Sequence, residues 1–246
     1  KNFCKKIKKS FKAKTSSDFL VIARIESLIL NNGARFWDSE FTLLMRFKPD
    51  KESSLQNTNM GSDHVGCPIA MNGKHIGIFY KVNEYEEQVV FEWWELGKQG
   101  DEFKSLVHSF KLDDKIEYFD VILRRNENKF TFSVNGKVLQ ESTELLSDDY
   151  THSLLWLGAA TMFSEEHSFP FRGDIEKVSL NKSALTNTHV NKFFTDYDTF
   201  LKDLNITANA YPLFASSFKK HTYYKIMDES INGNHPILYK DEWLQK

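Results

Sequence analysis

The sequence of 246 residues is poor in the residues that hold small stapled folds together. It contains only two cysteines, Cys4 and Cys67, and they do not form a C-x-x-C pair. A disulfide framework needs several cysteine pairs, and a structural zinc module needs closely spaced ligands. The cysteine content therefore argues against both classes, and we expect Cys67, which precedes a proline in an expected loop, to be a buried, inert thiol.

The chain also lacks a strong net charge and any long apolar run. Lys and Arg total 32 against 34 Asp and Glu, which gives a formal net charge of −2. A nearly neutral chain has no strong field to attract nucleic acid, so we expect no nucleic-acid partner. No apolar run approaches the roughly 18–20 residues that span a bilayer, so we expect no transmembrane segment.

Glycine and proline are sparse, with 11 and 5 residues, whereas aromatic residues make up 14% of the chain. Aromatic and β-branched residues suit the half-buried surface of a sheet. Seven segments have the apolar pattern of short strands, and one of them, 129–134, alternates strictly and is followed by the turn signal Asn135-Gly136. The expected strands are 41–47, 76–80, 89–94, 118–123, 129–134, 153–158 and 173–180. Many short strands without long helices between them predict an all-β fold, a two-sheet antiparallel jelly-roll sandwich.

The ends of the chain differ from this central part. Residues 1–14 hold seven lysines and no acid, and their apolar residues recur every four positions, which predicts a basic helix over 1–17. This helix could link to a neighbouring domain or lie on a membrane surface. We assign 18–246 to the jelly roll, with a helical appendix at 181–210 and a returning strand segment at 211–246. The polar segment 50–63 is expected to be irregular.

Three segments of the sequence have motifs whose order and spacing match those of a known group of jelly rolls. They are Phe171–Leu180 followed by Ser183–Thr186, Phe130–Val138 with its N-G-K ending, and Glu40–Pro49. These segments resemble the closing strand and helix start, a strand ending in N-G-K, and an early strand of laminin-G-like, concanavalin A-like domains. In the last of these Phe47 replaces the usual tryptophan. Together the motifs cover most of residues 40–194.

One further motif of this family is found at an unusual place in the chain. Asp228–Pro236 resembles the family's D-x-S-G-N-G-N-H-G turn, with Ile231 and Pro236 in place of two glycines. The motif ordinarily opens the domain, whereas here it lies near the end of the sequence. We therefore expect a permuted strand order, in which the segment after Tyr211 pairs beside the N-terminal strands. A second truncated copy or an unrelated tail is the alternative.

The resemblance also implies a calcium site. In the family this turn often holds Ca²⁺ together with an acidic residue of the closing strand, and oxygen ligands suit that hard cation. Carried onto this sequence, the ligands would be Asp228, the backbone around Asn232 and Gly233, Asn234, and Glu176. An Asx-rich turn stabilised by its own side chains is the alternative.

Carbohydrate binding is the function that the sequence favours. Sugars stack on exposed aromatic faces, while amides, hydroxyls and carboxylates bind their hydroxyl groups. Trp93 and Trp94 are adjacent, so one should face the core and the other a groove or solvent. The candidate ligand-binding residues are Trp93, Trp94, Asn72, His75 and Trp37. We expect a non-catalytic module of a larger glycan-processing or surface protein, such as a capsule polysaccharide glycosyltransferase.

Two other classes remain open. A protein–protein adhesion module of the laminin-G type would carry a contiguous apolar patch on one sheet face. A glycan-cleaving or glycan-modifying enzyme would need two carboxyl groups across one cleft. Glu92 and Glu95 are three residues apart on an expected strand and should therefore point to opposite faces. The compartment stays open between the cell exterior and the bacterial cytoplasm at the inner membrane.

Overall fold

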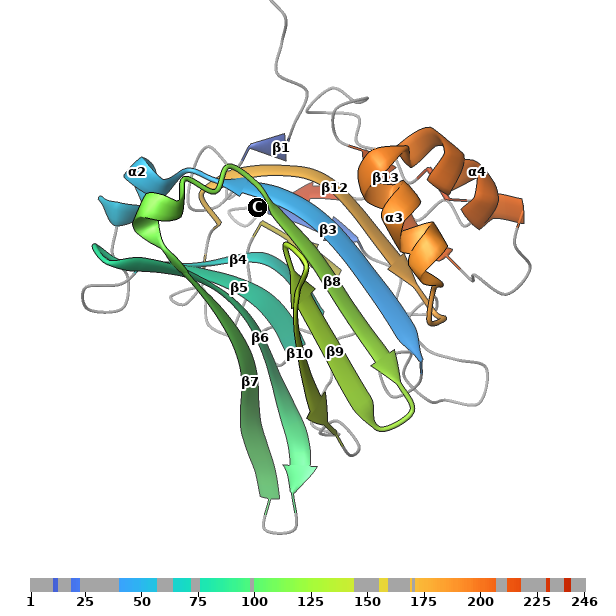
Figure 1. The fold of residues 1–246 in the computed structure, drawn as a ribbon, viewed down its shortest axis with the longest axis horizontal. Helices are drawn as coiled ribbons and strands as arrows, with labels where there is room; N and C mark the ends of the chain where they lie inside the picture. The colour runs from blue at the N-terminus through green and yellow to red at the C-terminus, as the bar shows by residue number, and fades with distance from the viewer. Residues whose placement is uncertain are drawn as a thin grey trace, which may run out of the picture.

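The fold is described from a computed structural model (Figure 1). The described residues are 11–12, 19–22, 40–56, 64–71, 76–97, 100–143, 155–158, 169, 171–206, 212–217, 229–230 and 237–239. They form two facing antiparallel sheets of seven strands each, with short helices at the periphery. The predicted all-β sandwich is therefore confirmed.

The first sheet, sheet A, carries the helical layer on its outer face. Its order is β1-β12-β3-β8-β9-β10, and β13 also pairs with β12. The strands are β1 (Phe11–Lys12), β12 (Gly173–Asn181), β3 (Phe41–Pro49), β8 (Phe119–Asn126), β9 (Lys129–Val134), β10 (Lys137–Ser142) and β13 (Pro212–Ser217).

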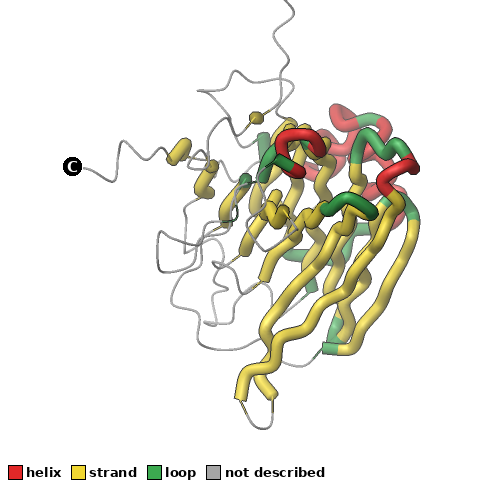
Figure 2. The backbone as a smooth tube through the Cα atoms, turned by 90° about the vertical axis from the view of Figure 1, so that its left-hand side faces the viewer, coloured by secondary structure: helices red, strands yellow, loops and turns green. Residues whose placement is uncertain are grey.

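The second sheet, sheet B, has the order β14-β2-β11-β4-β5-β6-β7. Its strands are β14 (Ile237–Tyr239), β2 (Phe19–Ile22), β11 (Leu155–Leu157), β4 (His64–Met71), β5 (Ile76–Val82), β6 (Glu86–Gly97) and β7 (Gly100–Lys111). The last two strands form a long hairpin that extends beyond the neighbouring strands (Figures 1 and 2).

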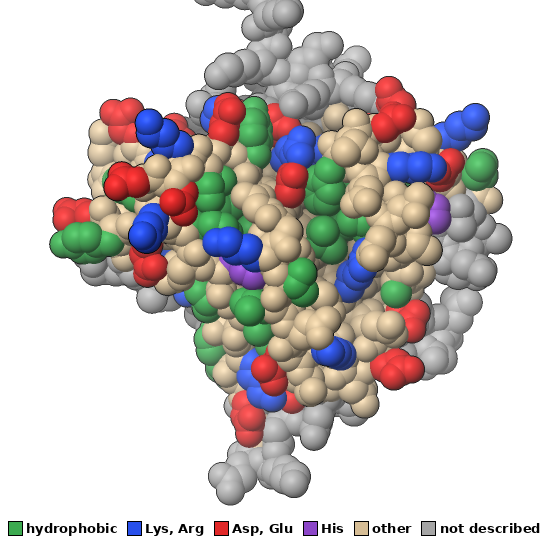
Figure 3. Space-filling model, viewed as in Figure 1, with side chains coloured by type: hydrophobic (Ala, Val, Ile, Leu, Met, Phe, Trp, Pro, Cys, Tyr) green, Lys and Arg blue, Asp and Glu red, His purple; other side chains and the backbone are tan. Residues whose placement is uncertain are grey.

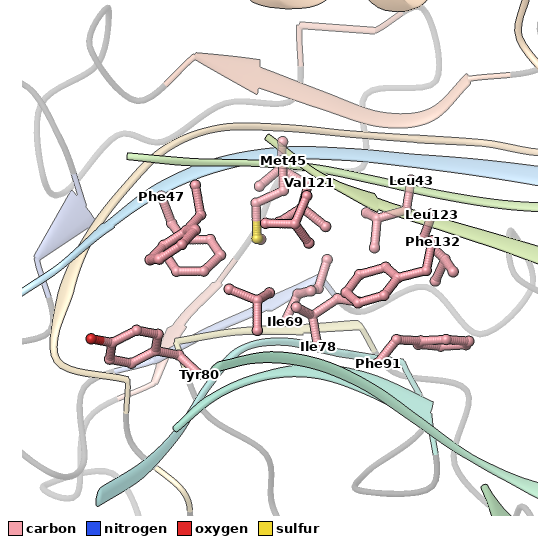
Figure 4. Close-up of a cluster of buried hydrophobic side chains, with 14 of the residues drawn as sticks. Leu43, Met45, Phe47, Ile69, Ile78, Tyr80, Phe91, Val121, Leu123 and Phe132 are labelled. Carbon is pink, nitrogen blue, oxygen red and sulfur yellow. The ribbon is translucent and has the colours of Figure 1, made fainter. Parts of the chain in front are cut away.

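The core fills the space between the sheets. Alternate residues of each strand point inward, so Phe41, Leu43, Met45 and Phe47 of β3 are all fully buried. Rings from both sheets meet in the middle, where Phe91 of β6 contacts Phe130 of β9 edge-on with centroids 4.8 Å apart. Figure 4 shows these side chains converging from the two layers.

A buried acid holds the short helix α2 (Lys51–Leu55) against one end of this core. Glu87 has no exposed surface, and it accepts a 2.9 Å hydrogen bond from the Tyr80 hydroxyl. Lys51 of α2 forms an ion pair with the same carboxylate at 2.6 Å. Burial, with Glu87 alongside, raises the pKa of Tyr80 far above its usual value. The helix lies within the segment that the sequence analysis expects to be irregular.

The two remaining helices form the expected appendix. α3 (Asn187–Thr195) and α4 (Tyr197–Ile206) pack on the outer face of sheet A, where Phe193 and Phe200 contact Leu44 in a second apolar cluster. Lys177 of β12 donates to the carbonyl oxygens of Phe193 (2.7 Å) and its neighbour at the C-terminal end of α3. A cation at that end of a helix is electrostatically favourable.

Both ends of the described chain join the sheets. β14 pairs with β2 through Leu238 and Leu20, and β13 pairs with β12. The segment after Tyr211 therefore lies beside an N-terminal strand, as the permuted order requires. At the other end, Phe11 and Lys12 form β1 and pair with β12 rather than continuing the expected helix. Residues 1–10 of that helix lie outside the described residues.

Strands β4, β7 and β10 are not among the expected strands. In β7, the inward residues Leu106 and Phe110 are interleaved with the outward residues Phe103 and Val107, so no simple alternation marks the strand. Cys67, expected in a loop, lies in β4 beside a register shift. Its thiol is buried and donates to the carbonyl oxygen of Ile69 (3.2 Å), and burial raises its pKa well above the usual value.

Among the described residues, no helix is both long enough and apolar enough to cross a membrane.

Among the glycines Gly77, Gly100, Gly136 and Gly173, Gly173 approaches another part of the backbone most closely. Its φ is +150°, and a Cβ there would lie 2.2 Å from the carbonyl oxygen of Lys48. Gly100 also has a positive φ, +125°, but a Cβ there would meet nothing within 4 Å.

We expect Gly100→Ala to lower the free energy of unfolding by about 1–2 kcal/mol through backbone strain alone. Gly173→Ala should cost about 1–3 kcal/mol more, because β12 must shift. Urea unfolding of both variants tests this, and equal losses would contradict it.

His108 connects the two sheets at their open edges and should make stability depend on pH. It is buried in β7, and its Nε2 lies 3.2 Å from the carbonyl oxygen of Phe132 in β9. Burial lowers the pKa of His108, and Lys137 lowers it further.

The folded state therefore favours the neutral imidazole of His108. The stability that depends on this neutral form is lost as pH falls below about 6.5, the pKa of histidine in the unfolded chain. The free energy of unfolding should fall between pH 7 and pH 5, and less steeply in His108→Gln. Equal slopes in the two proteins would contradict this.

Candidate functional site

The best-formed candidate site lies on the outer face of the β6–β7 hairpin. Because side chains alternate along β6, burial of Phe91 and Trp93 directs Glu92 and Trp94 outward. Trp94 is directly opposite Phe103 of β7, and Glu92 is opposite Ser105. We call these four residues, Glu92, Trp94, Phe103 and Ser105, the hairpin platform.

The platform combines aromatic and polar groups. The Trp94 and Phe103 rings meet at an angle of 63°, with centroids 5.7 Å apart. Phe103 is 53% exposed, a high value for a phenylalanine, and Ser105 is also exposed. Lys81 of β5 donates to the Glu92 carboxylate at 2.8 Å, which holds that carboxylate beside the aromatic pair. Such a surface can stack on an apolar ring face and hydrogen-bond to the groups around it.

A buried carboxylate on the inner face of the hairpin connects the segment that carries the platform to neighbouring elements. Glu95 is 5% exposed and accepts hydrogen bonds from the indole nitrogen of Trp93 (3.1 Å) and from the hydroxyl of Thr143 (3.0 Å). Lys104 of β7 is 2.9 Å away and carries a raised pKa because of this carboxylate. Thr143 follows β10, so Glu95 connects the hairpin to sheet A. These contacts fix the segment that carries Trp94.

The two adjacent tryptophans have different roles, as the strand pattern predicts. Trp93 has no exposed surface, stacks on Phe91 with centroids 4.8 Å apart, and belongs to the core. It therefore offers no face to a ligand, which corrects its place among the candidate binding residues. Trp94 is partly exposed on the platform. The other three candidates, Trp37, Asn72 and His75, lie outside the described residues.

Glu92 and Glu95 are not arranged as a catalytic pair. Glu92 lies on the outer face with Lys81, and Glu95 lies on the inner face with Lys104. A sheet therefore separates the two groups, as their three-residue spacing predicts. Sequence reasoning missed Phe103 and Ser105, because both lie on the unexpected strand β7. The one sequence signal for them was their position shortly after Trp94, at a distance that a hairpin can span.

The calcium prediction rests mostly on residues outside the described part of the chain, namely Asp228 and the segment 231–236. Within it, Glu176 is buried in β12 at a register shift. The hydrogen bond from Arg46 to Asp120 raises the pKa of Arg46, and the charge of Glu176 adds a smaller effect in the same direction. Glu229, the residue after Asp228, accepts a 2.8 Å hydrogen bond from the Ser217 amide. No group of three acidic, histidine or cysteine side chains with metal-binding geometry occurs among the described residues. Calcium binding stays a prediction.

No family model and no curated protein matches this sequence. Among solved structures, a proposed carbohydrate-binding protein of Bacteroides ovatus matches 94% of this chain at 12% identity with a TM-score of 0.56. The chain spans only 56% of that protein. A structure of botulinum neurotoxin type C, whose cell entry depends on two ganglioside molecules, matches 64% of this chain and 35% of its own at 12% identity, with a TM-score of 0.41.

The enzymatically active domain of tailspike protein 2 of bacteriophage CBA120 also matches, over 64% of this chain and 24% of its own, at 12% identity and a TM-score of 0.40. At TM-scores this low, the toxin and tailspike matches support no inference. The match to the Bacteroides protein shows a shared two-sheet β-sandwich, whereas closer kinship with laminin-G-like domains stays a prediction.

Substitution of the two neighbouring tryptophans tests whether Trp93 faces the core and Trp94 faces outward. Trp93→Ala should lower the free energy of unfolding by about 3–5 kcal/mol, because it opens a cavity beside Phe91 and removes a donor to Glu95. Trp94→Ala should cost less than about 1.5 kcal/mol, because its ring is partly exposed. Chemical unfolding of the two variants measures the difference, and a larger loss in Trp94→Ala would reverse the assignment.

Proposed function

We propose that this chain is a non-catalytic carbohydrate-binding module and that the hairpin platform contacts the sugar. The observation that carries the proposal is the exposed Trp94–Phe103 pair beside Glu92 and Ser105. The aromatic faces would stack on the C–H face of a pyranose ring, and the carboxylate and hydroxyl would bind its hydroxyl groups. The fold shared with a proposed carbohydrate-binding protein supports this reading.

The module would act within a larger glycan-processing or surface protein, of which a capsule polysaccharide glycosyltransferase is one example. Its part would be to hold a glycan while another domain carries out the chemistry. The fold of the related Bacteroides ovatus structure likewise occupies part of a longer chain. Glu92 would serve as a hydrogen-bond acceptor, because its pairing with Lys81 suits a fixed anion.

A glycan array tests the proposal with a matched set of variants. Trp94→Ala and Phe103→Ala should each weaken binding about tenfold or more, because each removes a stacking surface from the ligand. Tyr85→Ala is the control: it removes an aromatic ring that is 81% exposed on the turn at the other end of β6. The array should be read with and without Ca²⁺, which also tests the predicted calcium site.

The array also separates the competing functions. Binding of no glycan, together with a stable protein complex that Trp94→Ala disrupts, would favour an adhesion module. Val107, which is exposed on the same face of β7 beyond Ser105, would then extend the contact. Glycan turnover that Glu92→Gln abolishes while binding persists would favour an enzyme.

A further inference from the structure

A second surface lies on the outer face of sheet A, beside the helical layer. One cross-strand row runs through Asn181 of β12, Thr42 of β3, Arg124 of β8, Thr131 of β9 and Gln140 of β10. The turn after β12 covers Thr42, which donates to the carbonyl oxygen of Ser183. The part of the row on β8, β9 and β10 lies beyond this turn.

Arg124 is the charged residue of this row. Its Nη1 donates to the Asn187 side chain at the start of α3, 2.9 Å away, while its buried Nε has no hydrogen-bond partner among the described residues. Arg46 of β3 lies on the same outer face of sheet A. By contrast with Arg124, its Nε and Nη2 donate to the two carboxylate oxygens of Asp120. Among the described residues, no carboxylate pairs with Arg124.

Burial of a cation without a counter-charge is unfavourable. Burial lowers the pKa of Arg124, and no neighbouring acid offsets this effect. Lys182, the residue that follows Asn181 in the chain, likewise has a pKa lowered by burial alone. The first turn of α3 holds no acidic residue. Arg124 is thus a partly buried cation in the middle of a row whose members include no carboxylate.

The neutral side chains of the row are suited to sugar hydroxyls. Gln140 donates to the Thr131 hydroxyl at 3.3 Å. Thr131 lies directly opposite Arg124, and Gln140 is one strand further along the row. Val138, on the same face of β10, is 56% exposed. Figure 3, in the orientation of Figure 1, shows isolated basic side chains in a largely uncharged area beside and below α3.

We propose that Arg124, with Asn187, Thr131 and Gln140, binds the carboxylate and adjacent hydroxyls of an acidic saccharide. A guanidinium presents parallel N–H donors that match a carboxylate, and a sugar acid carries hydroxyl groups for the neutral side chains. This surface is on the opposite outer face from the hairpin platform, so it is a separate site. It extends the proposed function but does not depend on Trp94.

Calorimetric titration tests the site with a tetrasaccharide of β-1,4-linked glucuronate, and with the matching glucose tetrasaccharide as the neutral probe. Arg124→Gln should weaken glucuronate binding about 10- to 100-fold, the loss expected for one charge-assisted contact. Arg124→Lys keeps the charge but loses the planar pair of N–H donors. Its affinity for glucuronate should therefore lie between those of Arg124→Gln and the unaltered protein. Lys115→Gln, which removes an exposed cation from the turn before β8, should bind as the unaltered protein does.

The same titrations in Trp94→Ala separate this proposal from the proposed function. If the hairpin platform fails as a sugar site, glucuronate binding should still depend on Arg124. Equal glucuronate binding by Arg124→Gln and the unaltered protein would overturn the proposal, as would no glucuronate binding at all. Arg124-dependent binding of a glutamate-rich peptide that is tighter than that of glucuronate would overturn the saccharide assignment. Thermal unfolding of each variant checks that it is folded.

Discussion

The arrangement of this protein depends on the alternation of side chains along β6. Phe91 and Trp93 must enter the core, where they meet Phe130 from the other sheet. Because successive side chains of a strand point to opposite faces, this burial also fixes the direction of the side chains between and after them. Glu92 and Trp94 therefore face outward. The same packing that stabilises the sandwich thus presents the candidate binding surface.

The two faces of the hairpin have different electrostatic environments. On the inner face, Glu95 is buried and binds Trp93, Thr143 and Lys104 from three parts of the fold. Removing any of these partners would leave a buried carboxylate less satisfied, which is costly. On the outer face, Glu92 has one ion-pair partner and lies beside exposed groups. The inner contacts give rigidity, and a rigid aromatic platform loses less entropy when it binds a ligand.

The helical layer divides the outer surface of sheet A into two parts. Over β12 and β3 it buries Leu44 and holds Lys177 at the C-terminal end of α3. Over β8, β9 and β10 it leaves a polar face that begins at Asn187. Arg124 lies at the border between these parts, partly buried by the layer but without the acidic partner that Arg46 has. The Asp120 pair gives Arg46 a structural role, whereas the position of Arg124 supports the proposed saccharide contact.

The amino-acid sequence by itself determined the all-β class, most strands of the core, the turn at Asn135-Gly136 and the opposite faces of Trp93 and Trp94. These features follow from local alternation and turn chemistry, which neighbouring residues encode. Only the tertiary structure decided which tryptophan is buried, that Phe103 and Ser105 stand opposite Trp94 and Glu92, and that no acid among the described residues pairs with Arg124. Each of these depends on strand pairing between distant segments. β7, for example, shows too little alternation to be recognised before it is paired with β6.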